Sequence, residues 1–330
     1  MQASVIIPVK NDSKRLHRCL ESIYRSSIPV EVVVIDNGST DDSVSVARSS
    51  GAIVSVEPNL NIGALRNRGV ALSQGDVLAF VDSDHEVPQD WVASGLRLLE
   101  SEATAVAVGA PCLPPEDGTW VQRVWAIHRL RGPVRSETQW LGSGNLMVRR
   151  LSFLQVSGFR EDLVATEDVD LCYRLKAAGG RLIQDKAIRN VHHGEPRTVW
   201  EFTKKEYFRG SSGLKSWFAQ GFPARDIPNL IWPLWFGGVG TAWMAMFILV
   251  LSGLVVRFFG LMPEVTAYAF RAPERYSITL IGLLFLWFTP ALLLSIKVCW
   301  SEKKFGSVLR LALLYALFGI ARFAAMVRGR

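Results

Sequence analysis

The chain has 330 residues, of which 49% are hydrophobic, 20% are charged and four are cysteines. This length suits one full-size domain plus a second element, and the composition excludes intrinsic disorder, collagen-like repeats and a disulfide-stapled scaffold. The net charge of +7 is carried by residues 229–330, where ten Lys or Arg face three acids. Because the first 228 residues are formally neutral, the basic charge does not indicate a nucleic-acid partner.

The N-terminal part of the chain alternates between short apolar runs and helical patterns. Runs rich in β-branched residues predict buried strands at 4–8, 31–36, 52–56, 76–82 and 105–110. Apolar positions at helical spacing predict helices at 15–26, 42–49, 63–73 and 91–100. This alternation predicts an α/β fold with a doubly wound, mostly parallel sheet. Ligands of such sheets bind at the carboxyl ends of the strands.

Acidic residues follow three of the predicted strands. The first strand runs into Asp12, the second ends at Asp36, and the fourth closes with Asp82-Ser83-Asp84-His85. Each of these ends alone could be a turn or a helix cap, but three on one rim of a sheet indicate a site. Asp82 and Asp84 share one side of an extended chain, and paired carboxylates suit Mg²⁺ or Mn²⁺.

Residues 197–228 join this part to the tail, and we predict them to be a juxtamembrane segment. Within 197–213, four aromatic residues stand among Arg and Lys. That pattern is typical of an interfacial helix that meets anionic headgroups or a lipid diphosphate. A membrane anchor without substrate contact would have the same composition, and both interpretations stay open.

The C-terminal region, residues 229–330, contains three apolar stretches, at 230–256, 278–296 and 309–327. A helix needs roughly 20 apolar residues to cross a bilayer core of about 30 Å. The first two stretches carry no charge, and we predict that they span the membrane. The third holds Arg310 and Arg322, which must reach an interface or face protein. We expect it to span as well, with a helix lying in the interface as the alternative.

The chain opens on a strand-like run rather than a signal peptide, so we expect the first 228 residues to be cytoplasmic. The predicted spans then make a multi-pass protein of the inner, or plasma, membrane, with the loop 257–276 facing outward. The cysteines have no CxxC spacing, which agrees with a reducing compartment and argues against a metal cluster.

Taken in order, several segments resemble the family 2 glycosyltransferases with the GT-A fold. The resemblance covers residues 3–195 and is carried by SVIIPVKND, VVVIDNGSTDDS, NLNIGALRNRG, VLAFVDSDH, GSGNLMVRR, GFREDL and TEDVDLCYRLKAAGG. It implies a GT-A catalytic domain over 1–196. The tail is similar to that of bacterial members that act on lipid-linked or surface polysaccharides.

The resemblance implies a site for a nucleotide-diphosphate sugar. Its residues would be Pro8, Val9, Asp36, Asn61, Gly63, Arg66, Asp82, Gly144 and Asn145. In this assignment the backbone of Pro8 and Val9 contacts the nucleotide, and Asp36 receives the base. The glycines around Asn145 would let backbone approach a sugar or acceptor closely, although a plain turn would also contain them.

The resemblance also implies a bound Mg²⁺ or Mn²⁺ that bridges the donor diphosphate. Asp84 would ligate the metal, and Asp82 would lie beside the ribose or the metal. His192 and His193 form what we expect to be an exposed pair after a short strand. One of them could be a further ligand, or both could sit in a surface loop, and the sequence does not distinguish the two.

A general base is the last part of the site that the resemblance implies. Asp168 matches the family's base, and Glu167 would steady it or touch the acceptor. An inverting displacement needs one carboxylate to take the acceptor hydroxyl's proton while a metal neutralises the leaving diphosphate. At a helix N-terminus the two acids would also interact favourably with the helix dipole.

Together these features predict an inverting glycosyltransferase that moves a single sugar from a nucleotide-diphosphate sugar to a membrane-presented acceptor. We expect that acceptor to be a lipid-linked glycan of cell-surface polysaccharide or glycolipid synthesis. The Gln-x-x-Arg-Trp segment of processive synthases is absent from the sequence, which favours single-sugar transfer. The alternatives are transfer to a polyprenyl phosphate or other simple lipid, and an inactive nucleotide-sugar-binding membrane protein.

Overall fold

The computed structural model describes residues 1–163, 165–210, 227–258 and 273–328. The chain forms two compact units, residues 1–197 and 198–330, and each is described by itself. Most of the predicted juxtamembrane segment beyond residue 210 and most of the predicted outward loop lie outside the described residues.

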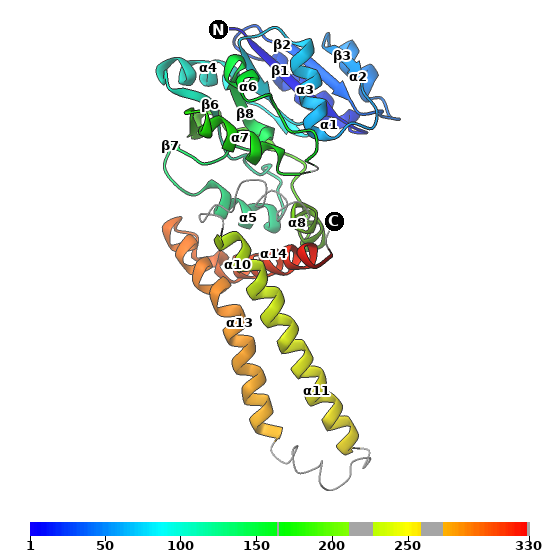
Figure 1. Ribbon diagram of the computed structural model, residues 1–330, viewed down its shortest axis with the longest axis vertical. Helices are drawn as coiled ribbons and strands as arrows, with labels where there is room; N and C mark the ends of the chain where they lie inside the picture. The colour runs from blue at the N-terminus through cyan, green and yellow to red at the C-terminus, as the bar shows by residue number, and fades with distance from the viewer. Residues whose placement is uncertain (164, 211–226, 259–272, 329–330) are drawn as a thin grey trace. The chain divides into compact units, whose positions relative to one another are not determined.

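The first unit is built on an eight-stranded sheet (Figure 1). Its strands lie in the order β3 (Ile53–Val56), β2 (Glu31–Asp36), β1 (Ala3–Val9), β4 (Val77–Phe80), β8 (Leu146–Arg149), β6 (Ala105–Gly109), β9 (Arg181–Asp185) and β7 (Arg135–Glu137). The four strands from β3 to β4 are parallel, as are β6 and β9, whereas β8 and β7 run antiparallel to their neighbours. The predicted mostly parallel α/β sheet is confirmed.

Strand β1 shows why the predicted strands are continuous apolar runs. All seven of its residues are buried. Val5 and Ile7 belong to a core formed with α1 (Ser13–Tyr24), α2 (Ser43–Ser49) and α4 (Trp91–Ser101). Ile6 points to the opposite core, where Val70 of α3 (Ile62–Leu72) and Leu171 of α7 (Glu167–Ala177) pack. Since both faces of the strand are covered, no polar position interrupts it.

The second half of the first unit departs from simple βα alternation. The segment 142–145 passes through the 3₁₀ turn η1 (Ser143–Asn145) directly into β8 and α6 (Arg150–Gln155), which precede α7. A second, two-stranded antiparallel sheet pairs β5 (His85–Glu86) with β10 (Val191–His192). Helix α5 (Trp120–Leu130) and the 3₁₀ turn η2 (Lys186–Ile188) complete the described elements of this unit.

The second unit is helical and contains the three predicted apolar helices. Its elements are α8 (Val199–Gly210), α10 (Ile227–Leu234), the π-helical turn η4 (Trp235–Val239), α11 (Gly240–Phe258), α13 (Pro273–Ser301), the 3₁₀ turn η6 (Phe305–Ser307) and α14 (Val308–Arg328). Three stretches are long and apolar enough to cross a membrane, namely Leu230–Ser252, Thr279–Ser301 and Phe305–Arg328.

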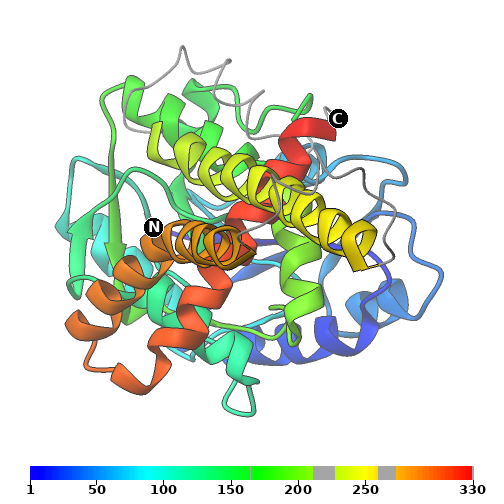
Figure 2. The same cartoon turned by 90° about the horizontal axis from the view of Figure 1, so that it is seen from below.

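Helix α14 differs from the other two apolar helices in its surroundings. It packs against α8, α10 and α13, and it runs across the direction of α11 in both views (Figures 1 and 2). Arg322 of α14 donates a 2.8 Å bond to Glu206 of α8, a carboxylate that is 2% exposed and also pairs with Arg209. Arg322 therefore faces protein, one of the two ways in which the sequence could accommodate it.

Candidate active site

Loops that follow three neighbouring strands, β2, β1 and β4, meet at the carboxyl rim of the sheet. The Ser83 hydroxyl donates a 2.9 Å bond to Asp12 Oδ2, which joins the ends of β4 and β1. The Thr40 amide donates a 2.7 Å bond to Asn11 Oδ1, which joins the loops after β2 and β1. The three polar strand ends that the sequence identified therefore do form one surface.

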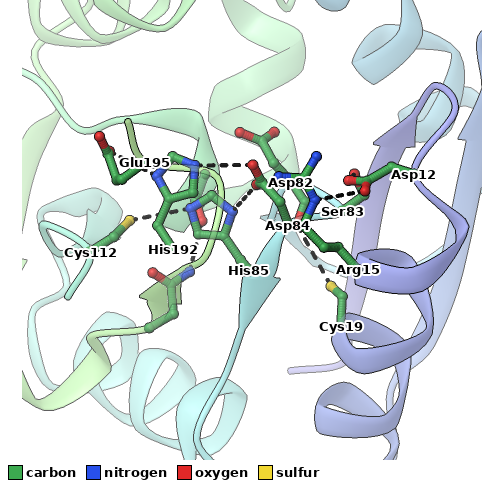
Figure 3. Close-up of polar contacts among 12 residues, drawn as sticks. Asp12, Arg15, Cys19, Asp82, Ser83, Asp84, His85, Cys112, His192 and Glu195 are labelled. Carbon is green, nitrogen blue, oxygen red and sulfur yellow. Dashed lines mark hydrogen bonds and ion pairs between the residues drawn. The ribbon is translucent and has the colours of Figure 1, made fainter. Parts of the chain in front are cut away.

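Three side chains at this rim form a group that could hold a metal ion (Figure 3). Asp84 contacts His85 Nδ1 at 2.9 Å through Oδ1 and His192 Nε2 at 3.2 Å through Oδ2. The candidate ligand atoms of the three residues lie within 4.8 Å of one another. His85 and His192 are paired in the β5–β10 ribbon, and their rings stack with centroids 4.1 Å apart. The ribbon thus delivers a distant histidine to the carboxylate after β4.

The surroundings of Asp84 fit a cation. Among the described residues, Asp84 Oδ1 and His85 Nδ1 are buried without a well-formed hydrogen bond. Glu195 contacts His192 Nδ1 at 2.9 Å, and a carboxylate behind a histidine is the usual way in which a metal ligand is oriented. Gly194 packs so closely that a Cβ there would lie 1.7 Å from Asp84 Oδ2. The carboxylate is therefore held in place by backbone that only glycine allows.

The same contacts set the charge state of the group without a metal. Burial raises the pKa of Asp84, but the hydrogen bonds and charges of His192 and His85 outweigh it and hold that pKa far below its ordinary value. Burial and the charge of His192 lower the pKa of His85, whereas its contact with Asp84 raises it, to about 9 overall. Because metal ligands must be deprotonated, a metal ion bound here would compete with protons for the ring nitrogens of the two histidines.

Arg66 joins two carboxylates beneath the rim. Its side chain is 2% exposed, and its two terminal nitrogens donate 2.7 Å bonds to Asp82 Oδ1 and Glu167 Oε1. Burial raises the pKa of Asp82, but the Arg66 charge outweighs it and leaves that pKa below its ordinary value. Arg66 was expected beside the nucleotide. The structure shows that its guanidinium fixes the end of β4 against the start of α7.

Asp168 is the acid of the first turn of α7 that lacks an ion pair among the described residues. Its oxygens accept backbone N–H bonds from Val169 at 2.8 Å and Ser143 at 3.3 Å. Burial raises the pKa of Asp168, and burial together with the Asp168 charge raises that of Glu167. Glu167 is 7% exposed and bound to Arg66, so Asp168 is the better placed of the two to accept a proton from a ligand.

Gly144 and Asn145, expected together at the sugar, have different environments. A Cβ on Gly144 would lie 2.7 Å from His85 Nε2 and 3.2 Å from Asp82 Oδ2, so this glycine does permit a close approach at the site. Asn145 is 1% exposed, donates to the carbonyls of Ala110 and Ile188, and accepts a bond from Trp91. Both N–H donors of the Asn145 side chain are used within the fold, and its expected role in the sugar-binding loop remains a prediction.

Asn61 and Gly63 also serve the fold rather than the rim. The Asn61 side chain caps α3 by accepting a 2.8 Å bond from the Ala64 amide, and it donates to the Glu161 carbonyl. A Cβ on Gly63 would lie 2.9 Å from the Arg160 carbonyl oxygen. These residues hold the segment before α7 against α3, and their expected place near the nucleotide remains a prediction.

The residues assigned to the nucleoside are placed at the ends of β1 and β2. Pro8 and Val9 are buried in β1, and the Val9 carbonyl accepts a 2.8 Å bond from the Asn37 amide. Asp36 is fully buried, and its Oδ1 accepts a 2.8 Å bond from the Ser39 amide. Among the described residues its Oδ2 has no hydrogen-bond partner. Recognition of the base by Asp36 remains a prediction.

The structure distinguishes the two adjacent histidines. His192 and His193 have side chains that are 12% and 18% exposed, so the expectation of an exposed pair is wrong. His193 Nε2 contacts Glu86 at 3.0 Å, whereas His192 contacts Asp84. His192 ends β10 and His193 begins the turn after it, and only His192 joins the candidate metal group.

Three residues of this region were not assigned from the sequence. His85 directly follows the Asp82-Ser83-Asp84 segment, so its position was a usable signal. Glu195 stands three residues after His192, a spacing that is informative only once the chain turn at Gly194 is known. Cys112 Sγ lies 3.5 Å from His85 Nε2, a contact across 27 residues that no local pattern indicates.

Comparison with known proteins finds similar glycosyltransferases. Residues 4–153 match the family model described as glycosyl transferase family 2. The chain is 26% identical over 235 residues to the glycosyltransferase AglE of Haloferax volcanii, which covers 68% of this chain and 77% of that protein. It is 27% identical over 230 residues to the glucosyl-dolichyl phosphate glucuronosyltransferase of the same organism, covering 62% and 69%.

A further relative is the pre-mycofactocin glycosyltransferase of Mycobacterium tuberculosis, 29% identical over 258 residues. The match covers 74% of this chain but about half, 52%, of that protein. Among solved structures, the mannosyltransferase PcManGT of Pyrobaculum calidifontis, in complex with GDP-Man and Mn²⁺, superposes with a TM-score of 0.60 at 16% identity over 99% of this chain and 86% of that one. Residues 4–153 are therefore similar to the family 2 glycosyltransferases, and the fold is GT-A-like.

Proposed function

We propose that this glycosyltransferase is an inverting enzyme that moves one sugar from a nucleotide-diphosphate sugar to a lipid-linked glycan at the membrane. The observation that carries the proposal is the placement of two kinds of group on one rim. Asp84, His85 and His192 form the candidate metal group, and Asp168 is a carboxylate without an ion pair among the described residues. Arg66 connects the two regions through Asp82 and Glu167.

In this proposal Asp168 is the general base. It accepts the proton of the acceptor hydroxyl as that oxygen attacks the anomeric carbon, and the bond from that carbon to the diphosphate oxygen breaks on the opposite side. The backbone bonds from Ser143 and Val169 keep the carboxylate in one orientation. Glu167 positions the turn through its bond to Arg66 and leaves the proton transfer to Asp168.

Asp84, His85 and His192 would hold the cofactor, which we propose to be Mn²⁺ rather than Mg²⁺. Two imidazoles and one carboxylate suit a transition metal better than Mg²⁺, which prefers oxygen ligands and water. The bound ion would neutralise the charge that develops on the leaving diphosphate. Glu195 keeps the His192 ring in position, and the absence of a side chain at Gly144 lets His85 lie against backbone.

Two observations support a lipid-linked acceptor, namely the activity in the name of one relative and the apolar helices of the helical unit. One relative, by its name, acts on glucosyl-dolichyl phosphate, which is a sugar carried on a lipid. The three apolar helices of this chain would keep it at the membrane where such acceptors are. Direct transfer to a polyprenyl phosphate remains the second acceptor to be tested.

We further propose that α11 and α13 cross the membrane as a pair and that α14 lies in the interface. Eleven uncharged residues separate Arg310 from Arg322, which gives an apolar length of about 18 Å against a bilayer core of about 30 Å. In addition, α14 packs against α8, which carries five charged residues, among them Glu206. Each charge placed at the bilayer centre would cost about 3 kcal/mol, so α8 must stay near water.

Two measurements on the detergent-purified protein test the catalytic proposal. The first is thermal stabilisation by UDP, GDP, dTDP and CMP, each with and without Mn²⁺ or Mg²⁺, because a ligand that binds the native state raises its stability. The second is sugar transfer to a lipid-linked glycan and to polyprenyl phosphate, with the anomeric configuration of the product determined. We expect Mn²⁺-dependent binding of one nucleoside diphosphate and an inverted product. A retained configuration would overturn the assignment of Asp168 as base.

A further inference from the structure

The helical unit contains a cavity of about 620 Å³. Its lining comes from four elements, namely α8, the stretch from η4 into α11, the middle of α13 and the C-terminal half of α14. Apolar and aromatic side chains dominate it, including Phe236, Trp243, Leu284 and Phe323. This volume lies within the range of about 300–1,000 Å³ that is typical of small-molecule sites.

The aromatic walls of the cavity are fixed by hydrogen bonds between helices. The indole N–H of Trp287 donates a 2.9 Å bond to the Phe236 carbonyl, and that of Trp243 donates a 2.9 Å bond to the Leu280 carbonyl. Both indole rings are partly buried, and each bond ties its ring to a neighbouring helix. The rings therefore cannot easily turn inward to fill the space, and the cavity is a preformed feature of the unit.

Two glycines expose the helix backbone on one side of the cavity. Gly237 and Gly240 both line it, within or just after the π-helical turn that follows Pro233. A Cβ on Gly240 would lie 3.1 Å from Trp287 Nε1, and one on Gly237 would overlap the Phe323 ring. π-Helical turns occur frequently at functional sites. Small residues here let the aromatic walls lie against backbone and leave the space between them open.

The polar groups of the lining are few and include no acid. They are the Tyr207 and Thr241 hydroxyls and the Arg328 guanidinium. Arg328 ends α14, and α8, which supplies Tyr207, also carries Lys204 and Lys205. An apolar space with a guanidinium in its lining complements a hydrocarbon chain that carries a phosphate, since guanidinium groups bind phosphate oxygens strongly.

We propose that this cavity binds the hydrocarbon chain of the acceptor lipid next to its phosphate. The inference rests on the proposed function, and it adds the place and the chemical class of the ligand: an isoprenoid or similar chain on a phosphate or diphosphate. The cavity is formed where α14 crosses α11 and α13 (Figures 1 and 2), and α14 is the helix assigned to the interface. The cavity therefore lies where hydrocarbon and headgroups meet.

Photo-crosslinking tests the site without requiring transfer. The probe is a polyprenyl phosphate with a diazirine in its chain, added to the full-length protein in lipid nanodiscs. We expect adducts on the α11 and α14 peptides that line the cavity, suppressed by unlabelled polyprenyl phosphate but not by an equal amount of phosphatidylglycerol. Suppression by both lipids alike would overturn the proposal, because the cavity would then hold any membrane lipid.

A matched pair of variants tests whether the probe labels the protein from within the cavity. Ala324→Trp fills the cavity from α14, whereas Leu313→Trp places the same side chain at an exposed position of α14 outside the lining. Ala324→Trp should reduce labelling by about tenfold relative to Leu313→Trp, which corresponds to a loss of about 1.4 kcal/mol in binding. Equal labelling of both variants would contradict the proposal.

The two variants also separate this inference from the proposed function. Ala324→Trp should raise KM for a long-chain acceptor and leave transfer to the same acceptor with a short alkyl chain unchanged. Transfer that is independent of chain length in both variants would overturn the cavity alone. Specific labelling of a protein that transfers no sugar to any lipid would overturn the proposed function and leave the cavity's ligand class standing.

Discussion

His85 and His192 lie opposite each other in a two-residue ribbon, and their stacked rings have centroids 4.1 Å apart beside Asp84. The chain between them is more than a hundred residues long, and it includes most of the second half of the first unit. The candidate metal group therefore depends on the fold of the whole unit. Asp84, which follows β4, is one candidate ligand, and β10 brings His192 beside it as another.

Substitution of His192 should remove metal-dependent binding of the nucleotide. His192→Ala deletes one of three candidate ligands, and we expect Mn²⁺-dependent thermal stabilisation by the preferred nucleoside diphosphate to be lost. Glu195→Gln keeps the ligand but weakens its orientation, which should reduce Mn²⁺ affinity by about 10- to 100-fold. Titration with Mn²⁺ at fixed nucleotide measures both effects.

His193 provides the matched control for that experiment. Its side chain contacts Glu86 at 3.0 Å on the other side of the strand, so His193→Ala should retain the Mn²⁺-dependent stabilisation. If His193→Ala lost the metal and His192→Ala kept it, the assignment of the ligand group would be reversed.

Substitution of Asp168 should abolish transfer without loss of donor binding. Asp168→Asn retains the size of the side chain and can keep one of its two backbone contacts through the amide oxygen, but it cannot accept the acceptor's proton. General-base catalysis typically contributes 10²–10⁴-fold, and we expect kcat to fall by about that factor. Nucleotide-dependent stabilisation should stay at the wild-type level. Full activity of Asp168→Asn would leave Glu167 as the remaining carboxylate of this turn to be tested.

The pH dependence of the reaction should report on Arg66. Burial raises the pKa of Asp168 and that of Glu167, while the positive charge of Arg66 acts in the opposite direction on both. The base works deprotonated, so activity is lost as pH falls through its raised pKa. Arg66→Gln removes the charge, which raises these pKa values further and moves the acid limb of kcat/KM to higher pH.

The acid limb of kcat/KM should shift by about one pH unit in Arg66→Gln, and Arg66→Lys is the control. One pH unit corresponds to about 1.4 kcal/mol of lost interaction, and we expect a shift of roughly that size for Arg66→Gln. Arg66→Lys keeps a positive charge at the same place but loses the two-pronged bond to Asp82 and Glu167. It should lower kcat while its acid limb stays near that of the wild type. Identical limbs for all three proteins would contradict electrostatic coupling between Arg66 and the base.

The parts of the fold that the sequence predicted share a physical property. β1, β2 and β4 are buried on both faces, so the sequence of each strand contains a continuous run of apolar residues. The β5–β10 ribbon has two residues per strand and is stabilised by its surroundings, so it has no periodicity to detect. The place of β8 in the sheet was not predictable for a different reason. Its sequence is that of an ordinary strand, and its antiparallel position between β4 and β6 depends on the topology of the whole unit.

The sequence indicated which residues lie near the site, but it did not indicate which residues they contact. Asp84 and Asp168 stand out because acids follow a buried strand or begin a helix. The bond between Arg66 and Glu167 joins residues 101 positions apart, and nothing local distinguishes it from a contact with phosphate. Asn145 shows the converse case, in which a polar residue beside the site satisfies buried backbone carbonyls. Polar residues near a rim can serve either purpose, and only their partners distinguish the two.

The assignment of α14 to the interface predicts that the C-terminus and the residues before α11 lie on the same side of the membrane. Only α11 and α13 then cross, so a reporter fused after Arg330 should behave like one fused at the N-terminus. The pair of bonds between Arg322 and Glu206 supports this, because it ties α14 to a charged helix that cannot enter hydrocarbon. A fusion truncated after Phe258 should report the opposite side and shows that the reporter can cross. If the full-length fusion also reported the opposite side, α14 would be a third span, and α8 would have to separate from it within the membrane.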